Sequence, residues 1–471
     1  MTLKLMKACF SCLGFLVLAT IILKDETVCN LGTTLTSTPK QISSATKPAT
    51  LYLKGKSMLV FGKNFRAYIF SALKHSAQTF TAFSGRKGQH IQNMSEHIVI
   101  MGWILKGNIL FSELQLFCCF YHVDGSISTV KADIRVTHFE SNLSIFNALQ
   151  CVCKVHSAVS PVIKVSIKES DSACPNTDTH YVHVDAIQQR QIDGIALCAK
   201  VLYDKLNASF LIEWFEAQRW LGVDKIFCYI NKDLNNDAKN VIKYYEETGL
   251  TKAASFEVPE IDTFPRHLAD KDRISWTDAG VPLLDCQERM HEYKYAICLD
   301  HDEILIPENI TLKDSLKRYL AEKFLSNKKL ALMYFQTMVH VTSWDEIIPN
   351  HPMFIGRLSN STPAMWDRQK YAFRPEGRSP GSCSSHSCDV RNGYKSVFVA
   401  DNSAIIHHFR SCRSSHKWNN SHSPKTLDLL VNQSKGIICS NFKRVRSYTT
   451  EKLADQIKHN VRKVRSLLGI D

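Results

Sequence analysis

Two aspartates spaced two residues apart, Asp300 and Asp302, directly follow an apolar run at 295–299, and a third acid, Glu303, comes next. Alternate residues that leave a strand point the same way, so we expect the two aspartates on one side. Clustered carboxylates repel each other unless a cation neutralises them, and hard oxygen ligands suit Mn²⁺ or Mg²⁺. The spacing therefore predicts a metal site that binds a substrate diphosphate.

Chance and a different chemistry could also produce this triplet. An Asp-x-Asp triplet is expected about once by chance in a chain of this size and ordinary composition. A phosphohydrolase of the aspartyl-phosphate type also has two such aspartates after a strand, and the first of them is a nucleophile. Those sites usually lie early in the domain and carry Thr or Val where this chain has Ile304, which disfavours that class.

The aspartates need a parallel sheet behind them, because ligands of such sheets bind beyond the carboxyl ends of the strands. After Gly194, strand-like runs alternate with helix-like runs, which predicts right-handed crossovers and a mostly parallel, Rossmann-like α/β sheet flanked by helices. We expect Ser209 to cap the first helix and Gly222 to end it. The expected strands are 195–201, 225–231, one through 256–258, and 295–299, and further helices are expected at 236–248 and 281–291.

The remaining chain divides by composition. Residues 58–190 hold short apolar runs separated by turn signals, which predicts a small β-rich module. Residues 191–440 hold the strand–helix alternation. Residues 441–471 predict a basic helix that packs peripherally or is solvated. Residues 25–57 are rich in Thr, Ser, Pro and Lys, which is typical of a stem between a membrane and a folded body.

The amino-terminal residues predict a membrane anchor. A short basic tail, 1–7, precedes an anchor segment, 8–24, whose uncharged part spans Ala8 to Leu23. Sixteen helical residues cover ~24 Å, which is adequate for a thin internal membrane. A cleaved signal peptide is the rival interpretation, but a small-x-small cleavage site is poorly formed. Basic residues before the run predict a single-pass type II protein whose body is luminal.

Cysteine usage and charge agree with a luminal body. Of 16 cysteines, Cys9 and Cys12 lie in the anchor, and the other fourteen lack paired CxxC spacing. Disulfides in an oxidising lumen are therefore favoured, although Cys228 and Cys298 lie in apolar runs that suit buried free thiols. Seven Asn-x-Ser/Thr sequons add weak support. The net charge of +13 suits anionic partners, but no nucleic-acid-binding motif accompanies it, so we expect no nucleic acid.

Several short motifs follow one another in a fixed order along the chain. They are Glu213-Trp214 with Leu221-Gly222-Val223 and Tyr229-Ile230-Asn231, Asp285-Cys286, the acidic stretch Asp300-His301-Asp302-Glu303 with Pro307, Lys370 with Arg374-Pro375 and His386, and His408-Phe409-Arg410. Over about residues 193–440 this ordered set resembles glycosyltransferase family 92. The sequence departs from the family at Gln218, where a histidine is usual, and at Phe409, where a tyrosine is usual.

The resemblance implies a GT-A fold in which Asp300 and Asp302 hold Mn²⁺ and the pyrophosphate of a UDP-sugar. It also implies β-galactosyl transfer from UDP-galactose to a glycan or glycoprotein acceptor, such as the fucose of N-glycans, in the Golgi. Inversion at the sugar means one in-line displacement assisted by a carboxylate base. By the same resemblance, His408 would complete the metal shell, with His407 as the competing residue.

Further roles are implied with alternatives left open. Arg410 would bind phosphate through its planar fork or brace Glu303, Arg374 would hold phosphate or anchor a loop, and Asp285 would contact the donor sugar or brace its helix. The base is not assigned, and its candidates are Asp345, Glu346, Glu376 and Asp389. The rival to the enzyme is a catalytically inactive relative that binds glycans or nucleotide sugars.

Overall fold

The computed structural model describes residues 58–61, 66–84, 88–105, 114–137, 146–155, 160–170, 172–187, 192–259, 279–344, 346, 348–379, 383–400, 402–410 and 443–470. The expected tail (1–7), anchor (8–24) and stem (25–57) lie outside these residues. None of the helices within them is long and apolar enough to cross a membrane. The described part is a mixed α/β protein with more strands than helices.

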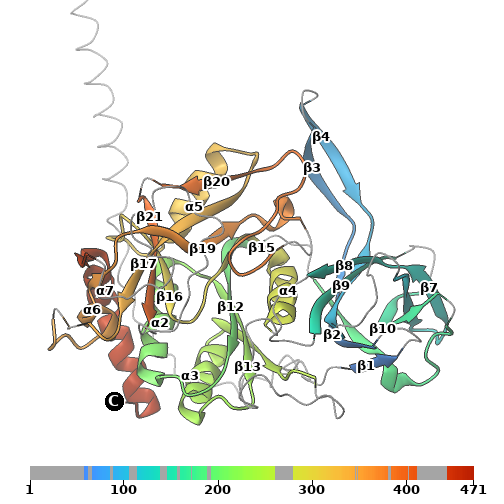
Figure 1. Cartoon of the computed structure of the whole chain (residues 1–471), viewed down its shortest axis with the longest axis horizontal. Coiled ribbons are helices and arrows are strands. Elements are labelled where there is room, and N and C mark those ends of the chain that lie inside the picture. Colours follow the sequence, from blue (N-terminus) through green and yellow to red (C-terminus); the bar gives the residue numbers. More distant parts are fainter. Residues whose placement is uncertain are drawn as a thin grey trace, which may run out of the picture. The chain divides into compact units, whose positions relative to one another are not determined.

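The first part of the described chain is made of strands, as the alternating apolar runs predict. They form a nine-stranded sheet in the order β7-β6-β10-β11-β2-β5-β9-β8, with β1 paired to β2, and a separate β3–β4 hairpin (Figure 1). The bounds are β1 Met58–Phe61, β2 Arg66–His75, β3 Gln78–Ser84, β4 Gly88–Met94, β5 His97–Leu105, β6 Leu116–His122, β7 Ile127–Lys131, β8 Asp133–Thr137, β9 Phe146–Lys154, β10 Val162–Glu169 and β11 Val182–Ala186, with a short 3-10 helix η2 at Asp178–His180.

A second nine-stranded sheet follows, in the order β14-β13-β12-β15-β19-β17-β21-β16, with β20 paired to β17. The four strands from β14 to β15 are parallel, as predicted. Strand β19 is antiparallel to both β15 and β17, so the other half of the sheet is mixed. The bounds are β12 Ile192–Leu202, β13 Lys225–Asn231, β14 Thr251–Phe256, β15 Tyr293–Cys298, β16 Glu303–Pro307, β17 Leu330–Val341, β19 Met365–Phe373, β20 Lys395–Val399 and β21 Ala404–Arg410, and a small pair is formed by β18 Asn360–Ser361 and β22 Val445–Arg446.

The helices cover this second sheet on both faces. Alternate residues of β12 point to different cores, because a strand's side chains alternate between its faces. Ile195 and Leu197 face the core that includes residues of α2, α3, α5 and α7, whereas Ala196 and Cys198 face α4 and the first sheet. The helices are α2 Ala208–Leu221, α3 Asn236–Glu247, α4 Gly280–Arg289, α5 Ser315–Ser326, α6 Phe354–Arg357 and α7 Tyr448–Leu468, with 3-10 helices η3 Met290–Glu292 and η4 Pro375–Gly377.

The ends of α2 differ in one detail from expectation. Asn207, and not Ser209, is the N-cap, and its side-chain oxygen accepts a hydrogen bond of 3.0 Å from the Phe210 backbone N–H. Both residue types cap helices, so the sequence alone left the choice between neighbouring positions open. Gly222 ends the helix as predicted, with a left-handed φ of 96° that glycine adopts without a Cβ penalty.

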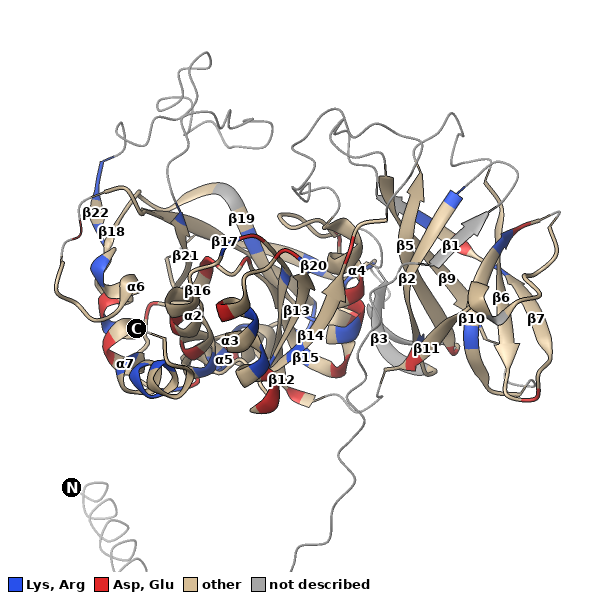
Figure 2. Cartoon of the chain, turned by 90° about the horizontal axis from the view of Figure 1, so that it is seen from below, with Lys and Arg blue, Asp and Glu red and all other residues tan. Residues whose placement is uncertain are grey.

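The basic helix expected near the carboxyl end is α7, and of the two expected states, peripheral packing and solvation, the structure shows packing. Its apolar stripe is completely buried in the core that also contains residues of α2, and it consists of Leu453, Ala454, Ile457, Val461 and Val464. The charged residues of α7 occupy its other side, where Lys452, Asp455 and Lys458 are exposed (Figure 2). The basic composition that indicated solvation therefore describes only half of the helix surface.

Cysteine chemistry agrees with the prediction of disulfides. The pairs are Cys118–Cys153, Cys119–Cys174, Cys198–Cys286 and Cys383–Cys388. Cys228 and Cys298 are buried free thiols, as their apolar surroundings indicated, and Cys151 is a third. The Cys198–Cys286 bond joins β12 to α4 across the face of the second sheet that α4 covers.

A buried charged cluster connects α4 to the first sheet. Glu288 of α4 accepts hydrogen bonds from Arg378 at 2.5 Å and from Gln150 of β9 at 3.2 Å, and its other oxygen lies 3.3 Å from His75 Nε2 of β2. His291 Nε2 lies 3.3 Å from the Arg378 guanidinium. Buried charges persist when they are paired, and the first sheet supplies part of this pairing through His75 and Gln150.

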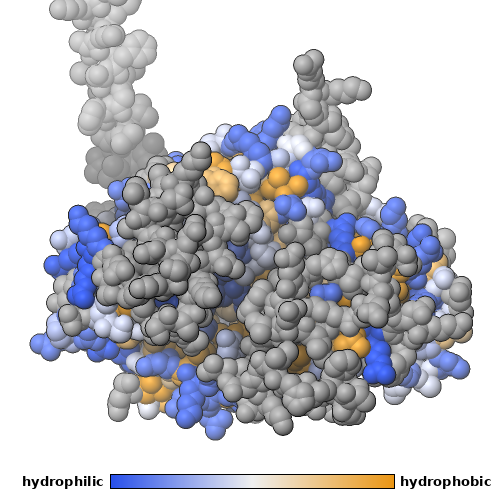
Figure 3. Space-filling view, viewed as in Figure 1, coloured by the Kyte–Doolittle hydropathy of each residue, from blue (hydrophilic) through white to orange (hydrophobic). Residues whose placement is uncertain are grey.

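Strand β20 lies at the surface. Its side chains are mostly exposed, including Val397 at 39% and Phe398 at 56%. The face drawn in Figure 3 is mainly hydrophilic where residues are described, with small hydrophobic patches, including one near β20. Phe398 stacks on Tyr334 at 4.8 Å and meets Trp366 edge-on at 5.2 Å.

Candidate active site

The acidic stretch lies where the sequence predicts it, just beyond the carboxyl end of β15. The Leu299 backbone N–H still donates to the Cys198 carbonyl of the parallel strand β12 over 3.0 Å. The chain then turns, because the Glu303 N–H donates to the Asp300 carbonyl over 3.0 Å, and enters β16. Asp300 and Asp302 therefore sit on a tight turn between two strands of the second sheet.

Asp302 and His408, far apart in the chain, are neighbours in the structure. The antiparallel pairing of β16 with β21 sets Glu303 opposite His408, and the Phe409 N–H donates to the Asp302 carbonyl over 2.8 Å. His408 Nε2 then lies 3.3 Å from Asp302 Oδ2. His407 points to the other side and pairs with His340, whose Nε2 is 2.9 Å from His407 Nδ1. Of the two competing histidines, the structure brings His408 to the acidic turn.

Glu303 supports this turn from behind. Its carboxylate accepts the Asp300 backbone N–H at 2.8 Å, and its other oxygen lies 3.5 Å from His408 Nδ1. A carboxylate behind one imidazole nitrogen fixes the ring so that the other nitrogen faces the site. The Glu303 backbone carbonyl accepts the Trp214 indole N–H at 2.8 Å. Trp214 thus braces the turn from helix α2.

Two lysines hold the carboxylate of Asp300. Lys200 Nζ lies 2.5 Å from Oδ1, and Lys370 Nζ lies 2.8 Å from Oδ2 and 3.2 Å from Glu303 Oε2. Lys370 stands on β19 with a completely buried side chain, whereas Lys200 lies near the end of β12 with 13% of its side chain exposed. Neither lysine was predicted as a site residue.

The charges of the site shift its pKa values in opposite directions. Burial alone would raise the pKa of Asp300, but Lys200 and Lys370 outweigh it and hold that pKa well below the usual range. Burial is likewise outweighed at Asp302, where His408 lowers the pKa to about 2. Burial would lower the pKa of His408, yet Asp302 and Glu303 raise it above its usual value. Both aspartates are therefore ionised at neutral pH.

The donor set fits a divalent cation in part. Two ligands of a small metal ion stand roughly 3 Å apart, which matches the distance between Asp302 and His408. Both oxygens of Asp300 face ammonium groups instead. No cluster of three or more His, Cys, Asp or Glu side chains arranged for a metal occurs in the part of the chain that is described. Ions such as Mg²⁺ commonly use one or two carboxylates and take their other ligands from substrate phosphates and water. Asp302 and His408 are therefore enough protein ligands for such an ion.

The other predicted donor contacts are distributed differently. Arg410 follows His408 on β21, and its charge acts on the His408 imidazole. Asp285 is completely buried on α4 and accepts from Ser71 at 2.5 Å, Tyr229 at 2.5 Å and Arg289 at 2.8 Å, so it braces its helix. Arg374 donates to the backbone carbonyls of Phe324 and Lys328 at the end of α5.

The structure separates the candidate bases. Glu346 follows β17 beyond Val341, which pairs with Arg410, and its carboxylate lies 3.4 Å from the Arg357 guanidinium. Glu376 lies in η4, past the far end of β19, six residues from Lys370. Asp389 is exposed, and Asp345 lies outside the described residues. Only Glu346 among the described three follows a strand end on the side of His408.

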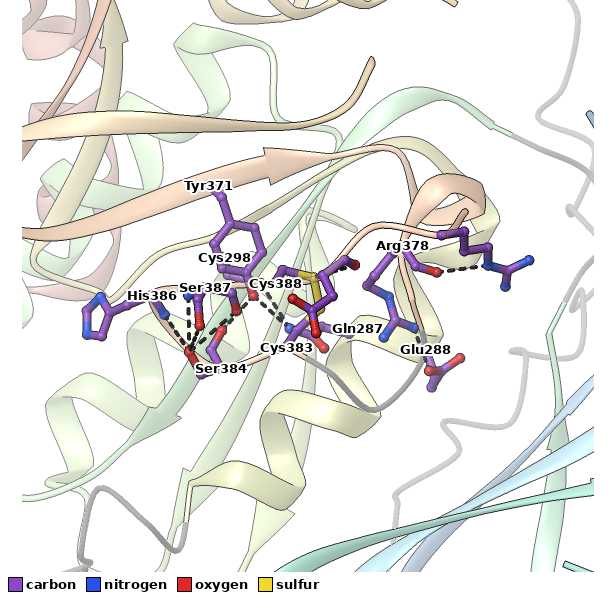
Figure 4. The surroundings of a disulfide bond; sticks show 12 residues. Gln287, Glu288, Cys298, Tyr371, Arg378, Cys383, Ser384, His386, Ser387 and Cys388 are labelled. Carbon is purple, nitrogen blue, oxygen red and sulfur yellow. Dashed lines mark hydrogen bonds and ion pairs between the residues drawn. A yellow bond between two sulfur atoms is a disulfide. The ribbon is translucent and has the colours of Figure 1, made fainter. Parts of the chain in front are cut away.

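The Cys383–Cys388 loop supports the strand that carries Lys370. The Tyr371 hydroxyl donates to the Ser384 carbonyl at 2.7 Å and accepts from Gln287 at 2.9 Å (Figure 4). His386 Nδ1 lies 3.1 Å from the Gln369 carbonyl. Figure 4 shows the His386 ring pointing away from the disulfide. Burial lowers the pKa of His386 to about 3, and the charges of Lys370 and Lys200 add to that effect.

Comparison with known proteins decides the family. The family model of glycosyltransferase family 92 matches residues 193–446, which is more than half of the chain. The chain belongs to glycosyltransferase family 92. The match covers β12 to β22 and thus every residue of the acidic site. Membership in family 92 supports a glycosyltransferase that uses a sugar donor and a glycan acceptor, and it agrees with the resemblance carried by the ordered motifs.

Other comparisons add little to this family 92 chain. None of the curated protein sequences matches it. Among 23 matching chains of solved structures is the crystal structure of HddC from Yersinia pseudotuberculosis, with 10% sequence identity. That match covers 46% of this chain and 92% of HddC, with a TM-score of 0.23, which is too low to establish a shared fold.

Proposed function

We propose that this family 92 chain is a metal-dependent, inverting hexosyltransferase that moves galactose from UDP-galactose to a glycan, such as fucose on an N-glycan. The observation that carries the proposal is the 3.3 Å approach of His408 to Asp302 at the end of the parallel strands, inside the family match. Ligands of parallel sheets bind at that edge. The proposed fold of the donor-binding part is GT-A-like.

Each residue of the acidic turn has a distinct part in this proposal. Asp302 and His408 would hold a divalent cation, Mn²⁺ or Mg²⁺, which when bound supplies Lewis-acid stabilisation of the departing diphosphate. Glu303 keeps the His408 ring oriented from behind, 3.5 Å from its Nδ1. Arg410 lies two residues after His408 on β21 and adds positive charge there. Trp214 holds the turn against α2.

Inversion at the sugar requires a base that takes the proton of the acceptor hydroxyl in one displacement. Glu346 suits this part best by its place after β17, because β17 pairs with β21 beside His408. Its partner Arg357, at 3.4 Å, would have to release it. The acceptor would then approach from the end of β17 and β21.

The proposed location is the Golgi membrane, with a type II anchor at residues 8–24 and a luminal body. The four disulfides found among the described residues support an oxidising compartment, because disulfides rarely persist in the cytosol. The anchor itself lies outside the described residues. Localisation of the tagged full chain, with protease protection of the carboxyl terminus, tests this part.

The test of the activity is a donor screen with the purified full chain. Release of UDP from UDP-galactose is measured with Mn²⁺, with EDTA, and with a glycan array carrying fucosylated N-glycans. We expect UDP release that EDTA abolishes and that Asp302→Asn reduces by about 100-fold or more, since a lost metal ligand removes several kcal/mol from the transition state. Equal turnover with EDTA, or none with any nucleotide sugar, contradicts the proposal.

A second candidate is a relative that binds nucleotide sugars without transferring them. The observation in its favour is that both oxygens of Asp300 are taken by Lys200 and Lys370. Binding of UDP-galactose to the wild-type chain, with no transfer to any acceptor of the array, would select this candidate over the enzyme.

A further inference from the structure

Lys200 has a backbone conformation that its residue type does not favour. Four non-glycine residues among those described have a positive φ, and three of them are Asp or Asn, which tolerate it. The fourth is Lys200, with φ 54°. It coincides with a register shift in the pairing of β12 with β13, between Cys198 and Val201. Strained backbone of this kind persists where the surroundings enforce it and is concentrated at functional sites.

The irregularity directs the Lys200 side chain to the acidic turn. A bulge re-aims the side chains of its strand, and here the ammonium group reaches Asp300 Oδ1 at 2.5 Å. Lys370 reaches Oδ2 of the same carboxylate at 2.8 Å from the other side of β15. The two ammonium groups thus stand together on one carboxylate at the edge where the proposed function requires the donor to bind.

This pair of charges does not suit a bare metal ion. A divalent cation on Asp302 and His408 would be repelled by two nearby ammonium groups. A metal-bound diphosphate changes this interaction from repulsion to attraction, because its anionic oxygens attract the ammonium groups and cancel the metal's charge. Lys370 is wholly buried and bound to Glu303 as well, at 3.2 Å, whereas Lys200 retains some exposure and is held by the Asp300 carboxylate. Lys200 is the ammonium group better placed to reach a ligand.

We infer that Lys200 binds the diphosphate of the donor, and that Asp300 positions Lys200 and Lys370 for this instead of ligating the metal. The inference rests on the proposed function, since it requires a nucleotide donor at this edge. In the absence of nucleotide, Asp300 holds Lys200 in place. When the donor enters, the ammonium group turns from the carboxylate to a phosphate oxygen. Asp302 and His408 remain the protein ligands of the cation.

The experiment measures binding without turnover. UDP is titrated calorimetrically into the purified full chain in saturating Mn²⁺, and Mn²⁺ binding without nucleotide is followed by the EPR signal of the free ion. The variants are Lys200→Met, Lys200→Asn, Lys200→Arg and Asp300→Asn. Asn tolerates a positive φ, so Lys200→Asn keeps the test valid if Lys200→Met does not fold. The matched control is Lys317→Met, which breaks the Lys317–Asp224 pair of 3.1 Å at the opposite edge of the sheet.

We expect Lys200→Met and Lys200→Asn to weaken UDP binding by about tenfold or more, the loss of a charge-assisted bond, and Lys200→Arg to restore most of it. Mn²⁺ alone should bind these variants at least as tightly as it binds the wild type. Asp300→Asn should weaken UDP binding while it reduces Mn²⁺ affinity far less than Asp302→Asn does, and Lys317→Met should change neither.

Unchanged UDP affinity in both Lys200 variants overturns the inference. So does a loss of Mn²⁺ affinity in Asp300→Asn equal to that in Asp302→Asn, because Asp300 would then be a direct ligand. A wild-type chain that binds no UDP in Mn²⁺ overturns both this inference and the proposed function. A wild type that binds UDP regardless of Lys200 leaves the proposed function intact.

Discussion

The indole N–H of Trp214 donates to the backbone carbonyl of Glu303 over 2.8 Å, although 89 residues separate the two in sequence. Gln218, one turn further along α2, approaches the same oxygen at 3.4 Å. The first helix of the second sheet thus positions the turn that carries Asp300 and Asp302. Disturbance of α2 should therefore be felt at the acidic site.

Trp214→Phe tests this connection. The substitution removes a buried hydrogen bond and leaves a small void, so we expect the free energy of unfolding to fall by about 2 kcal/mol. Affinity for Mn²⁺ in the presence of UDP should fall with it, because the turn loses its brace. Urea unfolding and Mn²⁺ titration measure the two effects.

Trp220→Phe is the matched control. The Trp220 indole N–H is buried and makes no hydrogen bond among the described residues, so its removal costs no hydrogen bond. We expect a smaller loss of stability, below about 1 kcal/mol, and unchanged metal affinity. Equal effects of the two substitutions would mean that the Glu303 contact adds nothing.

Glu213 should be essential for the docking of α7. Its buried carboxylate accepts the Phe354 N–H at 2.9 Å, the Ile355 N–H at 3.0 Å and the Arg465 guanidinium at 2.5 Å. Glu213→Gln leaves Arg465 without its carboxylate, and we expect a loss of about 2–3 kcal/mol in urea unfolding.

Lys458→Ala serves as the comparison on the exposed side of α7. It removes a surface pair with Asp455 of 3.1 Å, and such pairs contribute little because water screens them. Its stability should stay within about 0.5 kcal/mol of the wild type. A Glu213→Gln protein as stable as Lys458→Ala would contradict the importance of the carboxylate.

Stability should fall as the pH drops below the ordinary pKa of histidine. Burial lowers the pKa of His291 well below its usual value, and the charge of Arg378 contributes. Below pH ~6.5 the unfolded chain binds a proton on His291 that the folded chain does not bind. The contribution of neutral His291 to the free energy of unfolding is therefore present above that pH and is lost as the pH falls. Below pH ~6.5, the free energy of unfolding of His291→Gln should therefore fall less steeply with decreasing pH than that of the wild type, by up to about 1.4 kcal/mol per pH unit.

Urea unfolding of the wild type and His291→Gln at several pH values between 7 and 5 measures this difference. The other buried histidines whose pKa is lowered, such as His97, contribute to both proteins and cancel in the comparison. Parallel pH dependence in the two proteins would show that His291 already binds a proton in the folded state.

The backbone of Lys200 should store strain. Lys200→Gly and Lys200→Ala both remove the ammonium group, so the difference between their free energies of unfolding reports the backbone strain alone. In an ordinary strand an alanine variant is more stable than a glycine variant. At φ 54° we expect the reverse, with the glycine variant more stable by about 1 kcal/mol. Thermal unfolding of the pair is the measurement, and an alanine variant as stable as the glycine variant would disprove strain.

Much of the second sheet could be predicted because its signals are local. The apolar run at 225–231 coincides with β13, and Gly222 ends α2, since these features depend on a few adjacent residues. The place of Asp300 and Asp302 followed from one strand and the parallel-sheet rule. Strands β19 and β21, by contrast, join this sheet through distant pairings that no local period reveals.

The partners of the acidic turn depend on those distant pairings. Lys370 reaches Asp300 only because β19 pairs with β15, and its sole sequence signal was its place among the family motifs. Lys200 had a weaker signal, a charged residue inside an apolar strand. At α7 the sequence indicated a helix but left peripheral packing and solvation open. A count of apolar residues at i, i+3 and i+4 positions would have favoured packing.

The role of α7 also bears on how the protein is made. Arg465 comes 252 residues after Glu213 of α2, whose carboxylate it binds, and the neighbouring Trp214 supports the acidic turn. Synthesis proceeds from the amino terminus, so earlier strands can pair during translation, but Glu213 gains its Arg465 partner only after α7 has left the ribosome. A stop codon that removes Arg465 should therefore disturb α2 and the acidic turn even though every strand of the second sheet has been made.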